Sequence, residues 1–129
     1  MPIKYKPAPD LQEKALEICK ALFPHVKVEH ISCIRSFGSS SRGTIARCHA
    51  LGKVMQLGLG RKAFYTIEFL SETFDRMSEK DQLKTMIHEL MHIPKSFGGG
   101  FKHHDFVCEE NVTLMYNQYM RLKDANQFW

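Results

Sequence analysis

The sequence predicts a single α+β domain over residues 1–129, and three observations lead to this fold class. The chain has 129 residues, 43% of them hydrophobic and 25% charged, which is typical of one ordinary globular domain. A helical pattern near the N-terminus is followed by short apolar stretches separated by turn residues, as expected for strands. Two more helical patterns occupy the second half of the chain. We therefore expect helices and a small sheet to share one core.

The first helix is predicted to begin near Asp10 and to end before Pro24. Asp10 with Glu13 three residues later has the pattern of a capping box, and a helix rarely continues into a proline. The face expected in the core carries Leu11, Ala15, Ile18, Cys19 and Leu22.

Four stretches are predicted to form strands. Residues 26–37 and 44–51 flank a turn-rich segment and are expected to pair as a hairpin. In that hairpin Cys33 would face Cys48, and we interpret the two as small apolar residues packed in the sheet, with a metal or disulfide pair as the alternative. Residues 54–59 are expected to form a third short strand, and residues 65–70, rich in aromatic and β-branched side chains, a fourth.

The second half of the chain contains two predicted helices. Ser78, followed three residues later by Asp81, is a capping signal, and the helical pattern continues to His92, shortly before Pro94. Its apolar stripe consists of Leu83, Met86, Ile87 and Leu90. A last helix is expected from about Phe106 to Leu122, with a core stripe of Cys108, Val112, Met115, Tyr119 and Leu122.

The sequence His88-Glu89-Leu90-Met91-His92 is an H-E-x-x-H pattern within a predicted helix. Two histidines four residues apart lie on nearly the same side of a helix, so both imidazoles can bind one metal ion. This pattern predicts a zinc peptidase with one zinc ion, in which His88 and His92 are ligands and Glu89 is the general base that activates a water. Because the apolar stripe lies on another side, both histidines are expected to face a cleft.

A catalytic zinc needs a third protein ligand. The segment from Phe97 to Asp105 contains three consecutive glycines and then two histidines, and such a turn can bring the chain back over the helix. We assign His104 as the third ligand in preference to His103. Glu109 and Glu110, early in the last helix, are the rivals.

Composition also restricts the compartment and the partners. The longest apolar stretches are only a few residues, and the N-terminus lacks an apolar signal-peptide core, so we expect a cytoplasmic protein without a membrane partner. No C-x-x-C pair occurs among the four cysteines, which we expect to be mostly free thiols. A net charge of +4 makes nucleic acid a weaker candidate partner than a protein or peptide substrate. The oligomeric state is left open.

Two other functions are compatible with the pattern. One is a zinc-stabilised, non-catalytic module that binds protein or nucleic acid through a basic face; the other is a metal-dependent nuclease. The residues of the expected basic face are Arg35, Arg42, Arg47, Lys53, Arg61 and Lys62. Glu89 favours the peptidase, because a purely structural site does not need it. A peptide substrate could add to a sheet edge, for which we consider residues 54–59. Tyr65, Tyr116 and Arg35 carry groups suited to stabilising an oxyanion.

From His88 through Pro94 and the glycine turn to His104, the sequence resembles a small prokaryotic, largely archaeal, family of metallopeptidases that is SprT-like in pattern. The resemblance implies a zincin-type α+β fold. It consists of an N-terminal helix, a small, mostly antiparallel sheet of three to four strands, an active-site helix and a C-terminal helix. It also implies that His88, His92 and His104 are the zinc ligands and Glu89 the general base.

Overall fold

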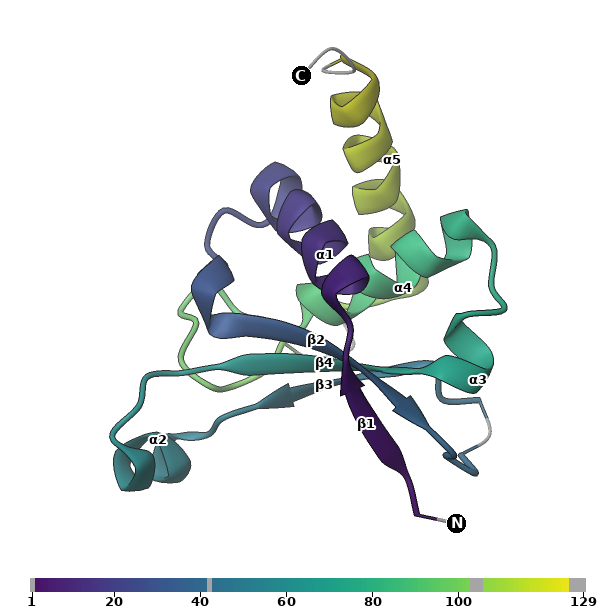
Figure 1. Cartoon of the computed structure of the whole chain (residues 1–129). Helices are drawn as coiled ribbons and strands as arrows, with labels where there is room; N and C mark the ends of the chain where they lie inside the picture. Colours follow the sequence, from purple (N-terminus) through teal and green to yellow (C-terminus); the bar gives the residue numbers. More distant parts are fainter. Residues whose placement is uncertain (1, 42, 103–105, 126–129) are drawn as a thin grey trace.

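The computed structural model describes residues 2–41, 43–102 and 106–125, and over these residues the fold is α+β, as predicted. Figure 1 shows its elements. The strands are β1 (Lys4–Pro7), β2 (Ile31–Phe37), β3 (Ala46–Ala50) and β4 (Tyr65–Leu70). The helices are α1 (Pro9–Leu22), α2 (Lys53–Leu59), α3 (Ser71–Phe74), α4 (Glu79–Met91) and α5 (Glu109–Ala125). A short 3₁₀ turn, Val28–His30, precedes β2.

The four strands form one mixed sheet in the order β1-β2-β4-β3. β1 pairs with β2 and β3 pairs with β4 in antiparallel orientation, whereas β2 and β4 are parallel. β2 and β4 are the two inner strands, β1 and β3 lie at the edges, and the side chains of β4 are buried on both faces, as is typical of strands inside a sheet.

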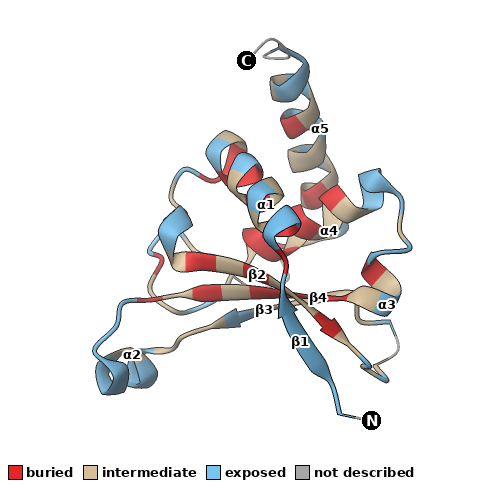
Figure 2. Ribbon diagram, in the orientation of Figure 1, coloured by how far each residue is buried: buried red, intermediate tan, exposed pale blue. Residues whose placement is uncertain are grey.

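The helices α1 and α4 cover one face of the sheet, α5 packs against these two helices, and buried residues gather between helices and sheet (Figures 1 and 2). The predicted stripes of the helices lie there. All five stripe residues of α1 and all four of α4 are buried, and in α5 Val112 and Tyr119 are buried while Met115 and Leu122 pack beside them. Cys108 does not belong to the last helix, because α5 begins at Glu109 and not near Phe106. Burying such a stripe is the main source of stability for a helix of this length. Among the described residues, no helix is long and apolar enough to cross a membrane.

The predicted hairpin of residues 26–37 with 44–51 is wrong, because β4 lies between β2 and β3. Cys33 and Cys48 therefore do not face each other: each is the register partner of Ile67, on opposite sides of β4. Both are free thiols whose burial raises the pKa to about 12, which agrees with a packing role. The hairpin interpretation failed because β4, the most apolar strand, is inserted between two strands that are adjacent in sequence.

Two further expectations need correction. Residues 54–59 belong to helix α2 and are not a strand; Gly60, in the left-handed conformation at φ 65°, ends that helix. The first helix begins at Pro9, and its N-cap Ala8 makes no side-chain capping bond. Asp10 is not the N-cap; its carboxylate instead accepts hydrogen bonds from Arg35. Strand β1 and helix α3 had no sequence prediction.

Candidate active site

Helix α4 carries the H-E-x-x-H residues. The Ser78 hydroxyl accepts a hydrogen bond from the amide of Asp81 at 3.1 Å, and this N-cap fixes the start of the helix as predicted. The buried stripe of α4 anchors one side of the helix against the core. His88 and Glu89 are directed toward the other side, where they line a groove. Both histidines were expected to face a cleft because they lie away from this stripe; this is confirmed for His88, whereas His92 is not among the residues that line the groove.

The two histidines lie one helical turn apart, and the centroids of their rings are separated by 5.1 Å. The Nδ1 atom of His92 donates a hydrogen bond to the carbonyl oxygen of Lys102 at 3.0 Å, which fixes the tautomer whose lone pair is on Nε2. A backbone carbonyl at this position is the usual partner of a metal-binding histidine. The chemistry of this pair therefore fits a metal ion.

Glu89 is buried, with 8% of its surface exposed. Its Oε2 atom lies 3.9 Å from Nε2 of His88. Burial raises the pKa of this carboxyl group to about 7, because the surrounding protein disfavours the charged form. The carboxylate is also close enough to the edge strand to add to the raised pKa of Cys48. A carboxyl group with these properties can accept and release a proton near neutral pH.

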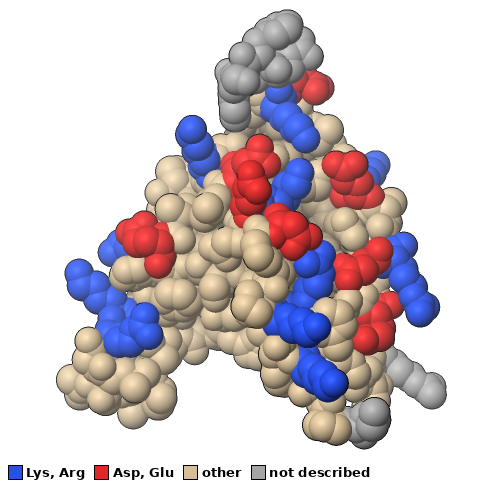
Figure 3. Space-filling view, in the orientation of Figure 1, with Lys and Arg blue, Asp and Glu red and all other residues tan. Residues whose placement is uncertain are grey.

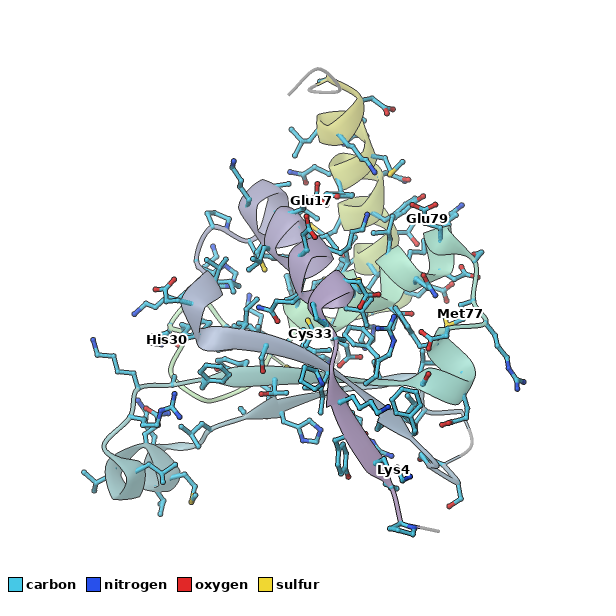
Figure 4. The ribbon with its side chains drawn as sticks, viewed as in Figure 1. Lys4, Glu17, His30, Cys33, Met77 and Glu79 are labelled. Carbon is cyan, nitrogen blue, oxygen red and sulfur yellow. The ribbon has the colours of Figure 1, made fainter. Side chains whose placement is uncertain are left out.

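The groove beside Glu89 has a volume of about 620 Å³. One wall is the start of β3 and the segment before it, the second is α4, and the third is the beginning of α5. Ala46, Met77 and Val112 contribute apolar surface, whereas Asp81 and Glu109 are acidic. Figure 4 shows Met77 and Glu79 at the N-terminal end of α4, with His30 near the opposite end of the sheet. The groove thus extends along α4 from Asp81 to Glu89.

The chain returns to His92 after the glycine turn, as the sequence predicted. Lys102 donates its amide to the carbonyl of His92 at 2.8 Å, in addition to accepting from the His92 ring. The turn is held by Tyr65, whose phenol accepts from the amide of Gly99 and donates to the carbonyl of Gly100. Sequence reasoning considered Tyr65 only as an oxyanion group, since nothing in the sequence placed the turn on the start of β4.

The predicted third ligand, His104, lies outside the described residues, as does His103. Within residues 2–41, 43–102 and 106–125, no three His, Cys, Asp or Glu side chains form a group that could hold a metal. Neither Glu109 nor Glu110 therefore joins His88 and His92 in such a group, although Glu109 lines the same groove.

Two arginines of the basic face expected for a nucleic-acid-binding module form ion pairs with acidic residues. Arg35 is bound by Asp10 and Asp75, at 2.7 and 3.2 Å, and Arg47 lies 3.7 Å from the buried Glu68. These pairs neutralise two of its arginines. Arg42, another member, lies outside the described part of the chain.

Comparison with known proteins gives one match. A family model described as "Putative phage metallopeptidase" matches residues 3–125, nearly the whole chain. No curated protein and no solved structure matches.

Proposed function

The chain belongs to the putative phage metallopeptidase family, and from this premise we propose that it is a zinc-dependent enzyme that hydrolyses peptide bonds with Glu89 as the general base. The observation that carries the proposal is the buried carboxyl group of Glu89 at the wall of a groove, beside the two histidines of the same helix. A metal site with only a structural role does not require such an acid.

In this proposal His88, His92 and His104 hold one zinc ion. The hydrogen bond from His92 to Lys102 supports the assignment, because it orients the ring and increases its basicity. When bound, zinc would polarise the scissile carbonyl group and lower the pKa of water.

Glu89 takes a proton from the attacking water and transfers it to the leaving amine. Both steps need a carboxyl group within reach of the attacking water, and the position of Glu89 on the wall of the groove, beside His88, supports this role. The low exposure of Glu89 also limits the exchange of its proton with bulk water.

The substrate is an extended segment of polypeptide that lies along β3. The sequence pointed to residues 54–59 as the sheet edge, but they are helical, and β3 is the edge strand beside the groove. Main-chain hydrogen bonds to such an edge bind a peptide without regard to its side chains. The groove next to Ala46 then receives one substrate side chain. The free cysteines agree with the cytoplasm as the compartment, which is part of this proposal.

The ligand assignment is tested by measuring zinc content and casein cleavage for wild type, His88→Ala and His104→Ala. We expect about one zinc per wild-type chain, and loss of both zinc and cleavage in each variant. Retention of full zinc by His104→Ala would contradict that ligand, and His103→Ala is the matched comparison.

A further inference from the structure

Helix α2 has its apolar side chains directed to solvent. Val54 and Leu57 are 83% and 85% exposed, and Met55 and Leu59 are also exposed. At 100° per residue, these positions and Gly58 cover more than half of the helix circumference. In Figure 1 α2 lies at the periphery, away from the layer formed by α1, α4 and α5. Apolar side chains gathered on one protruding element indicate a binding surface.

Gln56, the uncharged polar residue of α2, is directed inward. The side-chain amide of Gln56 donates to the carbonyls of Leu51 and Gly98, at 2.7 and 3.0 Å, and so ties the helix to the glycine turn. The fit is close, because a Cβ atom on Gly99 would lie 2.6 Å from the Gln56 amide nitrogen. This orientation of α2, with its polar side chain inward and its apolar side chains outward, is therefore fixed by specific contacts.

α2 is the continuation of the edge strand. After Ala50, two residues lead directly into the helix. The end of β3 is opposite Tyr65, which holds the turn that follows α4, whereas the start of β3 lines the groove. The groove and α2 thus lie toward opposite ends of β3. An extended chain advances about 3.3 Å per residue. A substrate that lies along β3 therefore reaches α2 about five substrate residues beyond the residue that lies beside Cys48.

We propose that the apolar face of α2, formed by Val54, Met55, Leu57 and Leu59, is a second binding site for the polypeptide substrate, one that takes an apolar segment of an unfolded chain. The inference rests on the proposed function and deepens it by naming unfolded polypeptides with apolar segments as the substrate class. If the substrate pairs antiparallel with β3, this segment lies N-terminal to the scissile bond, since β3 runs toward α2.

The charges around α2 indicate a second property of the substrate segment that would bind there. Lys53, Arg61 and Lys62 are exposed at the two ends of the helix, and Figure 3 shows Lys and Arg side chains beside this lobe. Acidic residues next to the apolar ones in the substrate would complement them. The same cations disfavour a second copy of this chain as the occupant, because two like-charged ends would approach each other.

The test compares two substrates of different length. Wild type, the double variant Val54→Ser/Leu57→Ser and the control Leu114→Ser are assayed on casein and on a peptide of about six residues taken from a casein cleavage site. Leu114 is a 59% exposed leucine of α5, so the control removes the same kind of side chain elsewhere. We expect the double variant to lower the ratio of kcat/KM on casein to kcat/KM on the peptide about tenfold, through KM, and the control to leave the ratio unchanged.

An unchanged ratio, or an equal loss on both substrates, would overturn the inference. A binding measurement separates it from the proposed function: zinc-loaded Glu89→Gln protein is titrated into fluorescently labelled casein, with and without the α2 substitutions. A Kd that rises about tenfold with the α2 substitutions supports the second site. If wild type cleaves nothing, the peptidase proposal is refuted, but this rise in Kd would still support the second site. Equal Kd values, or a wild-type dimer that the α2 substitutions convert to monomer, would overturn the second site.

Discussion

The phenol of Tyr65 accepts a hydrogen bond from the amide of Gly99 at 2.9 Å and donates one to the next carbonyl, that of Gly100, at 2.8 Å. The first residue of β4 thus holds the turn that follows α4. Two residues later, Lys102 is hydrogen-bonded to both the ring and the backbone of His92. A buried side chain of the sheet therefore supports the position of a proposed metal ligand through the turn.

Tyr65→Phe is predicted to weaken zinc binding about tenfold, because the turn that orients His92 loses two hydrogen bonds. Burial raises the pKa of Tyr65, so its hydroxyl stays a donor over the working range of pH. Competition with a chelating dye measures the affinity. Tyr119→Phe is the matched control, because it also removes the hydroxyl group of a buried tyrosine, but in helix α5. Equal zinc affinities of the two variants would contradict this role of Tyr65.

Gly99→Ala should destabilise the metal-free protein by about 1–3 kcal/mol. Gly99 has φ 103°, which side chains rarely adopt, and a Cβ atom there would lie 2.7 Å from the carbonyl oxygen of Leu51. Gly100→Ala is the comparison, because nothing lies within 4 Å of its Cβ position and its φ is not in the left-handed region. Urea unfolding of both variants gives the two changes in free energy. Equal losses of unfolding free energy in the two variants would contradict the prediction, because the turn would then accommodate a side chain at Gly99 without strain.

Asp10→Asn is predicted to lower the free energy of unfolding at pH 7 by no more than about 1 kcal/mol, since the pair with Arg35 is partly exposed. The Arg35 guanidinium donates to both carboxylate oxygens and holds the pKa of Asp10 below its usual value of 3.8. A lowered pKa means that the stabilisation is present above the ordinary pKa and is lost as pH falls through the folded-state value. The difference from wild type should therefore shrink below about pH 4.

Urea unfolding at pH 7 and pH 3 measures this difference. Glu17→Gln serves as the control, because Glu17 and Lys14 form an exposed pair at 4.0 Å that should contribute little at either pH. A difference between Asp10→Asn and wild type that grows on acidification would contradict the assignment.

Helices α1 and α4 could be predicted from sequence because their signals are local. The Ser78 cap and the 3.6-residue repeats in α1 and α4 depend on neighbouring residues, and the predicted core faces are the buried ones. The order of the strands depends on which strand is buried on both faces, a property of the assembled sheet, and so the pairing of residues 26–37 with 44–51 was wrong. Apolar spacing between glycines could not separate a strand from α2, whose apolar residues face solvent.

In the candidate site, too, some features could be predicted from sequence and others could not. The positions of His88 and Glu89 beside a groove followed from helical spacing, whereas the contacts of Gln56 and Tyr65 with the glycine turn join residues 34 to 42 positions apart. Such contacts leave no periodic signal in one sequence.

The most direct test of the account compares zinc content and casein cleavage for wild type and Glu89→Gln. The substitution keeps the size of the side chain, so the fold and the proposed ligand histidines are retained. It removes the carboxylate that would accept and release the proton. We predict about one zinc in both proteins and a cleavage rate at least 100-fold lower in Glu89→Gln. Equal cleavage by the two zinc-loaded proteins, or a wild type that binds no zinc, would contradict the account.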